Sequence, residues 1–152
     1  MPSFRSERKV RHSAAEMFDL VADVERYPEF VPLCTSLKVR RRSRDFEGRE
    51  VLLSEMSVGL GVVRERFTSR VTLDRPRLKV LVEYVDGPFR YMENVWSFRD
   101  EPDGGRSVVA FFIDYEFRSR TLKALMGSMF DAAFHKFAAA FETRADQVYG
   151  CA

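Results

Sequence analysis

The chain has 152 residues, which fits one domain around a single hydrophobic core. With 25 Lys and Arg against 23 Asp and Glu, its charges nearly balance, which argues against a surface built as a whole to hold DNA. No apolar run approaches the roughly 18 residues of a membrane-spanning helix, which excludes integral membrane proteins. Aromatic residues are plentiful, with 14 Phe, 5 Tyr and 1 Trp, and most of them can line an apolar space without hydrogen-bonding inside it.

The N-terminal part predicts a strand, a helix and a kinked connector. Residues 4–11 alternate loosely between apolar and polar, as a strand does. Ser13 to Glu16 matches a capping box, so a helix is expected to start there. Its apolar positions recur at steps of three and four residues: Ala14, Phe18, Val21 and Val24. Pro28 and Pro32 limit this helix, which leaves residues 27–32 as an aromatic connector.

Between Cys34 and Phe117 the chain predicts an antiparallel meander of strands. Turn signals separate strand-length segments at residues 45–48, 59–61, 74–76, 86–88 and 102–105. Alternation is cleanest in residues 63–73 and 109–117, where apolar side chains face one side. One face of the sheet is therefore expected to be apolar and the other solvated.

The last part of the chain predicts one long amphipathic helix. Its apolar residues follow helical spacing: Leu122, Met126, Met129, Phe130, Ala133, Phe134, Phe137 and Phe141. His135 lies on the opposite side and is expected to face water. The predicted fold is α+β, a curved antiparallel sheet with this helix lying across its apolar face.

The space between sheet and helix has two interpretations. The aromatic side chains can fill it as a packed core, or a strongly bent sheet can stand off from the helix and leave an apolar tunnel. Periodicity alone does not separate a filled space from a lined one. Met126 and Met129 suit an adaptable wall, and Gly127 weakens the helix beside them, which favours the tunnel.

A few polar residues fall on the apolar face of the predicted sheet. Glu65 shares the parity of Phe67, where an unpaired carboxylate would be costly, unless it lies beyond the core at the strand end near Gly61. Asn94 stands among apolar neighbours on another strand. Together with Ser54, Ser69 and Tyr115 as further candidates, Glu65 and Asn94 are expected to meet the polar head group of a ligand.

The sequence shows no set of residues for catalysis, metal binding or cofactor binding. His12 sits beside a helix cap and His135 on a wet face, so neither is a convincing base. No zinc-ligand spacing or Gly-rich phosphate loop is present. The protein is therefore not expected to be an enzyme or to need a cofactor. Cys34 and Cys151 are expected to be reduced, and no targeting signal is visible, which favours a cytoplasmic protein.

Arginines gather in two places. Four of them lie in residues 40–44, and three alternate along the predicted outer face of residues 64–70. These side chains can form an ordinary solvated face, or they can contact anionic lipid head groups or the phosphates of ribosomal RNA.

The segment Ala15 to Leu33, AEMFDLVADVERYPEFVPL, followed at once by Cys34, resembles the signature of the coenzyme Q-binding protein family. Weaker similarities follow in RFTSRV at 66–71, GPF at 87–89, NVWSF at 94–98 and DYEF at 114–117. That family belongs to the START-like polyketide cyclase and dehydrase superfamily, and its bacterial relatives include ribosome-association toxins. The resemblance covers nearly the whole chain.

The resemblance implies a single START-like domain over residues 1–152 with a helix-grip fold around a hydrophobic tunnel. It implies binding of ubiquinone or a similar prenyl lipid without chemical change, as a chaperone or carrier that supports respiration and quinone biosynthesis, with transient contact at the inner membrane surface. The alternative is a regulator that binds the large ribosomal subunit, and the third option is a polyketide cyclase or aromatase. The expected lining is Phe18, Val21, Tyr27, Phe30, Phe67, Trp96, Phe98, Phe111, Tyr115, Met126, Met129, Phe130 and Phe134.

Overall fold

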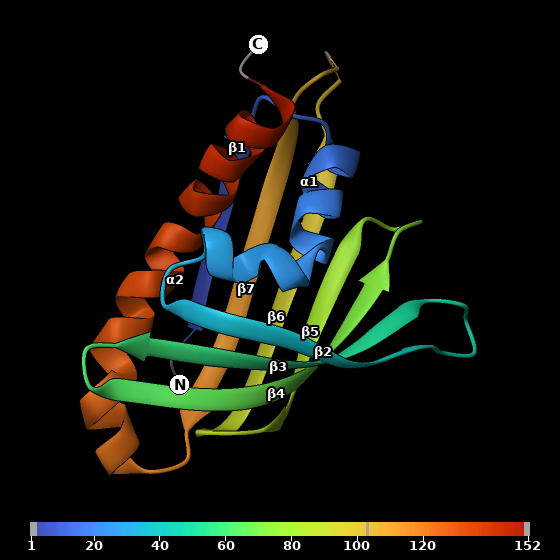
Figure 1. Ribbon diagram of the computed structural model, residues 1–152. Helices are drawn as coiled ribbons and strands as arrows, with labels where there is room; N and C mark the ends of the chain where they lie inside the picture. The colour runs from blue at the N-terminus through green and yellow to red at the C-terminus, as the bar shows by residue number, and fades with distance from the viewer. Residues whose placement is uncertain (1–2, 103, 151–152) are drawn as a thin grey trace.

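Seven strands and one long helix dominate the computed structural model, which describes residues 3–102 and 104–150 (Figure 1). The strands are β1 (Ser3–Val10), β2 (Cys34–Arg44), β3 (Glu50–Leu60), β4 (Val63–Asp74), β5 (Lys79–Asp86), β6 (Phe89–Asp100) and β7 (Ser107–Phe117). The helices are α1 (Ala14–Ala22), the 3-10 helix η1 (Val24–Glu29) and α2 (Arg120–Tyr149). Within this described part, no helix is both long enough and apolar enough to cross a membrane.

The strands form one antiparallel sheet in the order β1-β7-β6-β5-β4-β3-β2. β2 to β7 follow one another as a meander, and β1 completes the sheet beside β7. Figure 1 shows the sheet bending strongly, so that β2, β3 and β4 run across the direction of β6 and β7. The sheet thereby wraps around α2, which confirms the expected α+β helix-grip arrangement.

The sheet has two edges, and β2 forms one of them. Its pairing with β3 is interrupted by irregularities between Cys34 and Ser36 and between Val39 and Arg41. Such bulges bend a strand and change its twist locally. They lie in the edge strand that carries the run of arginines.

The start of α1 confirms the predicted capping box. The Ser13 hydroxyl accepts a hydrogen bond from the Glu16 backbone N–H at 3.1 Å, and the Glu16 carboxylate accepts one from the Ser13 N–H at 3.0 Å. The helix ends at Ala22, earlier than its apolar pattern suggested, and the chain continues as η1 through Pro28. α1 therefore covers one end of the sheet with a short buried face.

α2 runs further than its apolar pattern, which ended at Phe141. Its last turns are fastened to the N-terminal part of the chain: His12 Nε2 lies 2.7 Å from Asp146 Oδ1, and the Tyr149 hydroxyl donates to the Glu16 carbonyl at 3.0 Å. His135 is exposed, as predicted, although its ring packs against Phe4 with centroids 4.3 Å apart. The C-terminal end of α2 is thus held in place against β1 and α1.

The tight turn between β5 and β6 depends on Gly87. Its φ is +146°, and a Cβ added there would lie 2.5 Å from Phe67 Cβ. Only glycine allows the turn to approach β4 so closely.

Two predictions concern residues outside the described ranges. The predicted turn at 102–105 includes residue 103, and the predicted reduced state of Cys151 concerns a residue beyond position 150. Cys34 is a free, buried thiol.

Candidate ligand cavity

An apolar cavity lies between the concave face of the sheet and α2, beside η1. The volume of this cavity is about 80 Å³. It is lined by Val24, Tyr27, Val31, Pro32, Leu33, Leu37, Ser54, Met56, Val58, Phe67, Ser69, Val71, Val82, Phe89, Met92, Asn94, Trp96, Ile113, Phe130, Ala133, Phe134, Phe137 and Phe141. Many residues therefore border this cavity, but the cavity itself is narrow.

Aromatic rings from both the sheet and α2 form much of the cavity wall. The Trp96 ring packs edge-on against Phe141 of α2 with centroids 4.9 Å apart. Phe130 and Phe134 stack at 5.9 Å, and Phe89 meets Phe130 at 5.7 Å. Offset and edge-to-face packing of this kind stabilises each ring by its neighbours. The wall is thus held together across the sheet–helix junction.

Among the described residues that line the cavity there is no Asp, Glu, His, Lys or Arg. Its only phenol belongs to Tyr27, whose hydroxyl donates to the Val21 carbonyl at 2.5 Å. Burial raises the pKa of Tyr27 well above its ordinary value, with smaller contributions from Cys34 and Asp23. The cavity therefore offers an apolar environment without a group that exchanges protons near neutral pH.

Three further polar side chains interrupt the apolar wall. Ser54 of β3 lies opposite Ser69 of β4, with their hydroxyl oxygens 3.4 Å apart. On β6, Asn94 donates to the Phe112 carbonyl at 2.8 Å and accepts from the Trp96 indole N–H at 3.0 Å. These groups are the polar features available to a ligand inside the cavity.

The structure brings part of the predicted lining together. Its members are contributed by η1, β4, β6 and α2, which the sheet curvature places around one space. The predicted residues on the cavity wall are Tyr27, Phe67, Asn94, Trp96, Phe130 and Phe134.

Other predicted lining residues belong to the surrounding core instead. Phe18 packs against Phe98 at 6.0 Å, and with Val21 they fill the end of the sheet under α1. Phe111 and Tyr115 are buried beneath α2, where Phe111 meets Phe137 at 5.9 Å.

Three more predicted residues lie in α2 or pack against it, but they are not on the cavity wall. Met126 is buried, whereas Met129 is half-buried. The half-buried Phe30 ring packs on Phe141 at 5.0 Å and under the Arg144 guanidinium. The expectation that these residues line the space is corrected, because facing the concave side does not determine how close a residue lies to the unfilled part.

The expectation that Glu65 meets the head group of a ligand inside the cavity is also corrected. It is half-buried near the Gly61 end of β4, in a shallow surface hollow with Thr35, Arg64 and Arg66. Its Oε1 accepts only a long hydrogen bond, 3.4 Å, from the Arg66 backbone N–H. The alternative position at the strand end, beyond the core, is the one observed.

Sequence reasoning missed the wall formed by the loop before β2 and by the inner faces of β2 and β3. Leu33 and Leu37 lie opposite α2 across the cavity, beside Met56 and Val58. The alternation of Leu37 and Val39 was a usable signal for an inward face, but the surrounding arginines masked it. Leu33 has a φ of +69°, a backbone feature without a sequence signal of its own.

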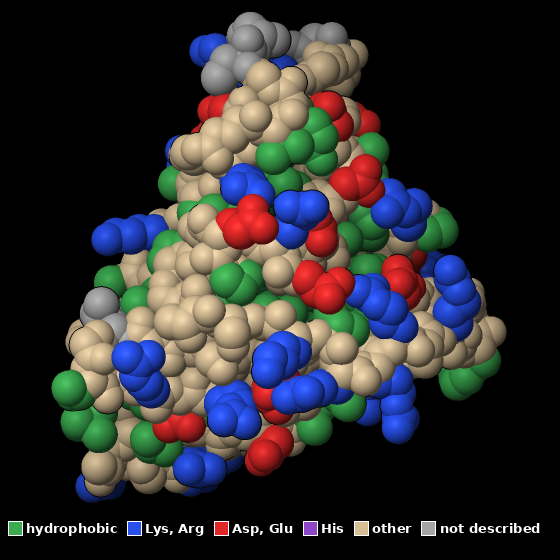
Figure 2. Space-filling model, viewed as in Figure 1, with side chains coloured by type: hydrophobic (Ala, Val, Ile, Leu, Met, Phe, Trp, Pro, Cys, Tyr) green, Lys and Arg blue, Asp and Glu red, His purple; other side chains and the backbone are tan. Residues whose placement is uncertain are grey.

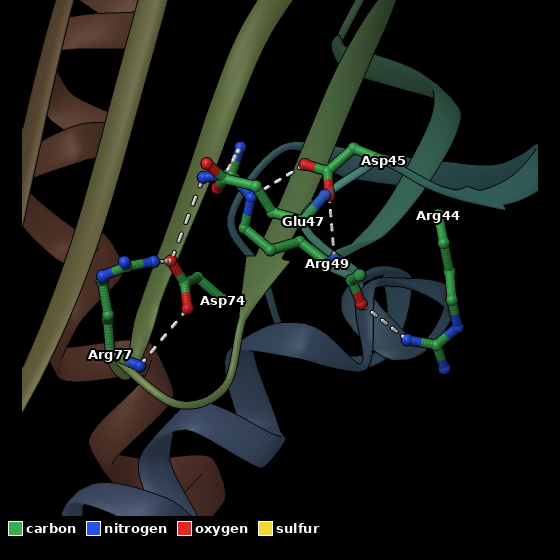
Figure 3. Close-up of polar contacts among 7 residues, drawn as sticks. Arg44, Asp45, Glu47, Arg49, Asp74 and Arg77 are labelled. Atoms are coloured by element: carbon green, nitrogen blue, oxygen red, sulfur yellow. Dashed lines mark hydrogen bonds and ion pairs between the residues drawn. The ribbon is translucent and has the colours of Figure 1, made fainter.

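A separate cluster of charged residues joins two turns at the far end of the sheet (Figure 3). Arg49 Nε donates to Asp45 Oδ2 at 2.8 Å, and Arg77 Nη1 donates to Asp74 Oδ2 at 3.0 Å. Desolvation raises the pKa of Asp45, but hydrogen bonds from Arg49 and Glu47 outweigh it and leave that pKa below its usual value. Arg49 Nη1 also lies 4.0 Å from Asp74 Oδ2, and this ion pair connects the β2–β3 turn to the β4–β5 turn.

Figure 2 shows Lys and Arg side chains interspersed with Asp and Glu over the region where Figure 1 draws β2, β3 and β4. The outer basic face consists of the exposed residues Lys38, Arg40, Arg41, Arg64, Arg66 and Arg70. Glu55 lies among them, 2.8 Å from Arg40 and 3.9 Å from Arg66, and the Arg40 hydrogen bond lowers the pKa of Glu55. This face is on the other side of the sheet from the cavity.

Known proteins resemble the chain over nearly its whole length. A ribosome association toxin RatA of Rickettsia prowazekii is 30% identical, covering 97% of this chain and 99% of its own. A mitochondrial coenzyme Q-binding protein COQ10 homolog B of Xenopus laevis is 33% identical, covering 95% of this chain and 59% of its own.

Solved structures share the fold. An 18 kDa protein of Caulobacter crescentus has a TM-score of 0.78 at 32% identity, covering 99% of this chain and 100% of its own. The Zhui aromatase/cyclase from Streptomyces has a TM-score of 0.72 at 17% identity, covering 95% of this chain and 90% of its own. The family model described as polyketide cyclase / dehydrase and lipid transport matches residues 10–142, and the chain belongs to this family.

Proposed function

We propose that the protein binds a prenyl quinone of the ubiquinone type in the cavity and carries it without changing it chemically. The observation that carries this proposal is the uncharged, aromatic cavity between the concave face of the sheet and α2. Such a space suits a ligand that is mostly hydrocarbon and has a small polar head. The relative named as a coenzyme Q-binding protein supports the choice of a quinone.

The energetics of an isoprenoid tail favour this kind of site. Each buried CH2 group contributes about 0.8 kcal/mol, so a few isoprene units give useful affinity with little polar recognition. The space is narrow, and a quinone ring enters only if side chains move apart. Met56 and Met92 are on the wall, and their flexible thioethers allow such an adjustment.

A carrier fits the cavity better than a cyclase does. Acid–base catalysis needs a titratable group within reach of the substrate, and the described lining provides no carboxylate or imidazole. Glu65, the acid that shares the strand parity of Phe67, lies outside the cavity.

We propose a cytoplasmic protein that touches the membrane surface transiently to load and release its ligand.

Mass spectrometry tests the proposal directly. Organic extraction of the purified protein is expected to release a prenyl quinone, and the emptied protein is expected to take up ubiquinone from loaded vesicles. Trp96→Ala should reduce uptake more than Arg41→Ala, since only Trp96 lines the cavity. A protein that contains no prenyl lipid and takes none from vesicles would refute the carrier function.

A second function, association with the large ribosomal subunit, is favoured by the outer basic face and by the ribosome association toxins among the relatives. Within the described residues, no ion pair engages Arg41, Arg64 or Arg70, so their charges are available to RNA phosphates. In a sucrose gradient of lysate, the protein should then migrate with large subunits at low salt. Arg64→Glu combined with Arg70→Glu should abolish that migration; migration that persists in this variant contradicts the assignment.

A further inference from the structure

Ser54, Ser69 and Asn94 form a polar patch on the concave face, inside the apolar cavity. Ser54 and Ser69 are directly opposite each other on β3 and β4, and Asn94 lies on β6 opposite Val82. Val82 in turn pairs with Val71 of β4, two residues from Ser69, so the patch crosses the floor of the cavity. The exposed fractions of the three residues are 2%, 4% and 9%.

The two serine hydroxyls have more hydrogen-bonding capacity than the protein uses. Their oxygens are 3.4 Å apart, longer than the usual O–H···O separation of about 2.7–2.8 Å. Each hydroxyl carries one hydrogen, and whichever serine donates, the hydrogen of the other meets no acceptor among the described residues. The pair therefore leaves one O–H donor for another molecule.

Asn94 adds a second donor to the same wall. Its amide has two N–H groups, and one of them donates to the Phe112 carbonyl. The Trp96 indole N–H donates to the Asn94 carbonyl oxygen, which fixes the orientation of the amide. The remaining N–H has no acceptor among the described residues, so the patch as a whole has a surplus of donors.

A surplus of buried donors selects a ligand that brings acceptors. A donor left without an acceptor in an apolar space is unfavourable, and a carbonyl oxygen relieves this without bringing a charge. A carboxylate or a phosphate would also accept a hydrogen bond, but the described residues that line the cavity include no Lys, Arg or His to balance its charge. The patch therefore suits a neutral carbonyl on an otherwise apolar molecule.

We infer that Ser54, Ser69 and Asn94 form the carbonyl-binding part of the cavity floor, where the head group of the ligand lies while its hydrocarbon part follows the aromatic wall. This inference rests on the proposed function and deepens it, because it assigns the orientation of a bound quinone. It assigns the serines a role in choosing the ligand, separate from the apolar contacts that provide general affinity.

The single tryptophan of the chain provides the readout, because Trp96 is on the cavity wall beside Asn94. Decylubiquinone should quench its fluorescence on binding. Decylbenzene, a hydrocarbon of similar shape without a carbonyl, is measured by its competition with decylubiquinone. Ser54→Ala combined with Ser69→Ala should weaken decylubiquinone binding about 10-fold, equivalent to about 1.4 kcal/mol, and leave decylbenzene binding within about twofold.

Ser107→Ala is the matched control, since Ser107 is another fully buried strand serine but lies outside the cavity. It should bind both probes as the unchanged protein does. If the double variant binds decylubiquinone as tightly as the unchanged protein, the carbonyl site is wrong while quinone binding stands. If the unchanged protein binds neither probe, the proposed function itself fails. Circular dichroism and the retained binding of decylbenzene show that a variant is folded.

Discussion

At the scale of single residues, His12 and Asp146 hold the end of α2 to the start of α1. His12 is 3% exposed, and its Nε2 lies 2.7 Å from Asp146 Oδ1. Asp146→Ala leaves a buried ring nitrogen without its partner, which should lower the free energy of unfolding by about 1–3 kcal/mol. Urea denaturation measures this change.

Asp131 provides the control for that prediction. Its pair with His135 is exposed on both sides and 3.8 Å long, so Asp131→Ala should change the free energy of unfolding by less than about 0.5 kcal/mol. Equal effects of the two substitutions would show that the buried contact has no special role.

Cys34 gives a second prediction at this scale, one that concerns pH. Desolvation by burial raises the pKa of its thiol to about 11, although a backbone hydrogen bond with Ser36 acts in the opposite direction. At pH 8 roughly one thiol in a thousand is then ionised, against roughly one in four for an ordinary cysteine. In a Cys151→Ser background, iodoacetamide should modify Cys34 about 100-fold more slowly than a model peptide at pH 8.

The pH profile provides the decisive measurement for Cys34. Because the thiolate is the reactive form, the rate should rise about tenfold per pH unit up to about pH 10. A rate that levels off near pH 8.5 would mean that the thiol is not buried as the structure has it.

At the scale of elements, we expect the same substitution, Gly→Ala, to change thermal stability in opposite directions at two positions. Gly87→Ala should lower the melting temperature by several degrees, because its Cβ would lie 2.5 Å from Phe67 Cβ at a positive φ. Gly127 is inside α2, where a Cβ would meet only Lys123 Cγ at 3.7 Å. Gly127→Ala should therefore raise helix stability by about 0.5–1 kcal/mol. Thermal unfolding followed by circular dichroism compares them, and shifts of the same sign would contradict this reading.

The elements themselves were largely predictable, because their signals are local. The capping box starts α1, glycines mark the turns, and period-2 and period-3.6 patterns separate strands from helices. Helix ends were less predictable: α1 stops at Ala22 although Val24 continues its apolar face, because the chain tightens into η1. The length of α2 depends on tertiary contacts such as that of Asp146, which no local pattern contains.

The cavity wall was predictable only in part, because it depends on how far each residue lies from the unfilled space. Phe67 and Phe98 share the concave face, yet Phe98 packs against Phe18 of α1, whereas Phe67 packs against Phe89 on the wall of the cavity. Leu37 joins the wall from β2, a strand that reads as polar, and Leu33 joins it from the loop just before that strand. The alternation of residues along a strand identifies the face on which a side chain lies, but not where along the bent sheet that side chain is.

At the scale of the whole molecule, the cavity and the outer basic face lie on opposite sides of the sheet, so the two proposed activities should be separable. Ala133 is a small, buried residue on the cavity wall. Ala133→Leu adds carbon atoms to a space that is already narrow, and should reduce quinone uptake at least about 10-fold without changing migration with ribosomes. Arg64→Glu with Arg70→Glu should do the reverse. Uptake assays and gradients on both variants check this, and a loss of both activities in either folded variant would contradict the separation.

The arginine run of β2 has a further consequence, because β2 is an edge of the sheet. An edge strand exposes unpaired backbone groups that can join a second sheet and start aggregation. Bulges and charged side chains are the usual protection, and β2 has both, with two irregularities in its pairing and exposed arginines from Arg40 to Arg44. A carrier of the proposed kind, which exchanges a hydrocarbon ligand through its aromatic interior, gains from an edge that repels its own copies. The same arginines that invite a role in binding therefore also hinder the pairing of this edge with a second copy of the chain.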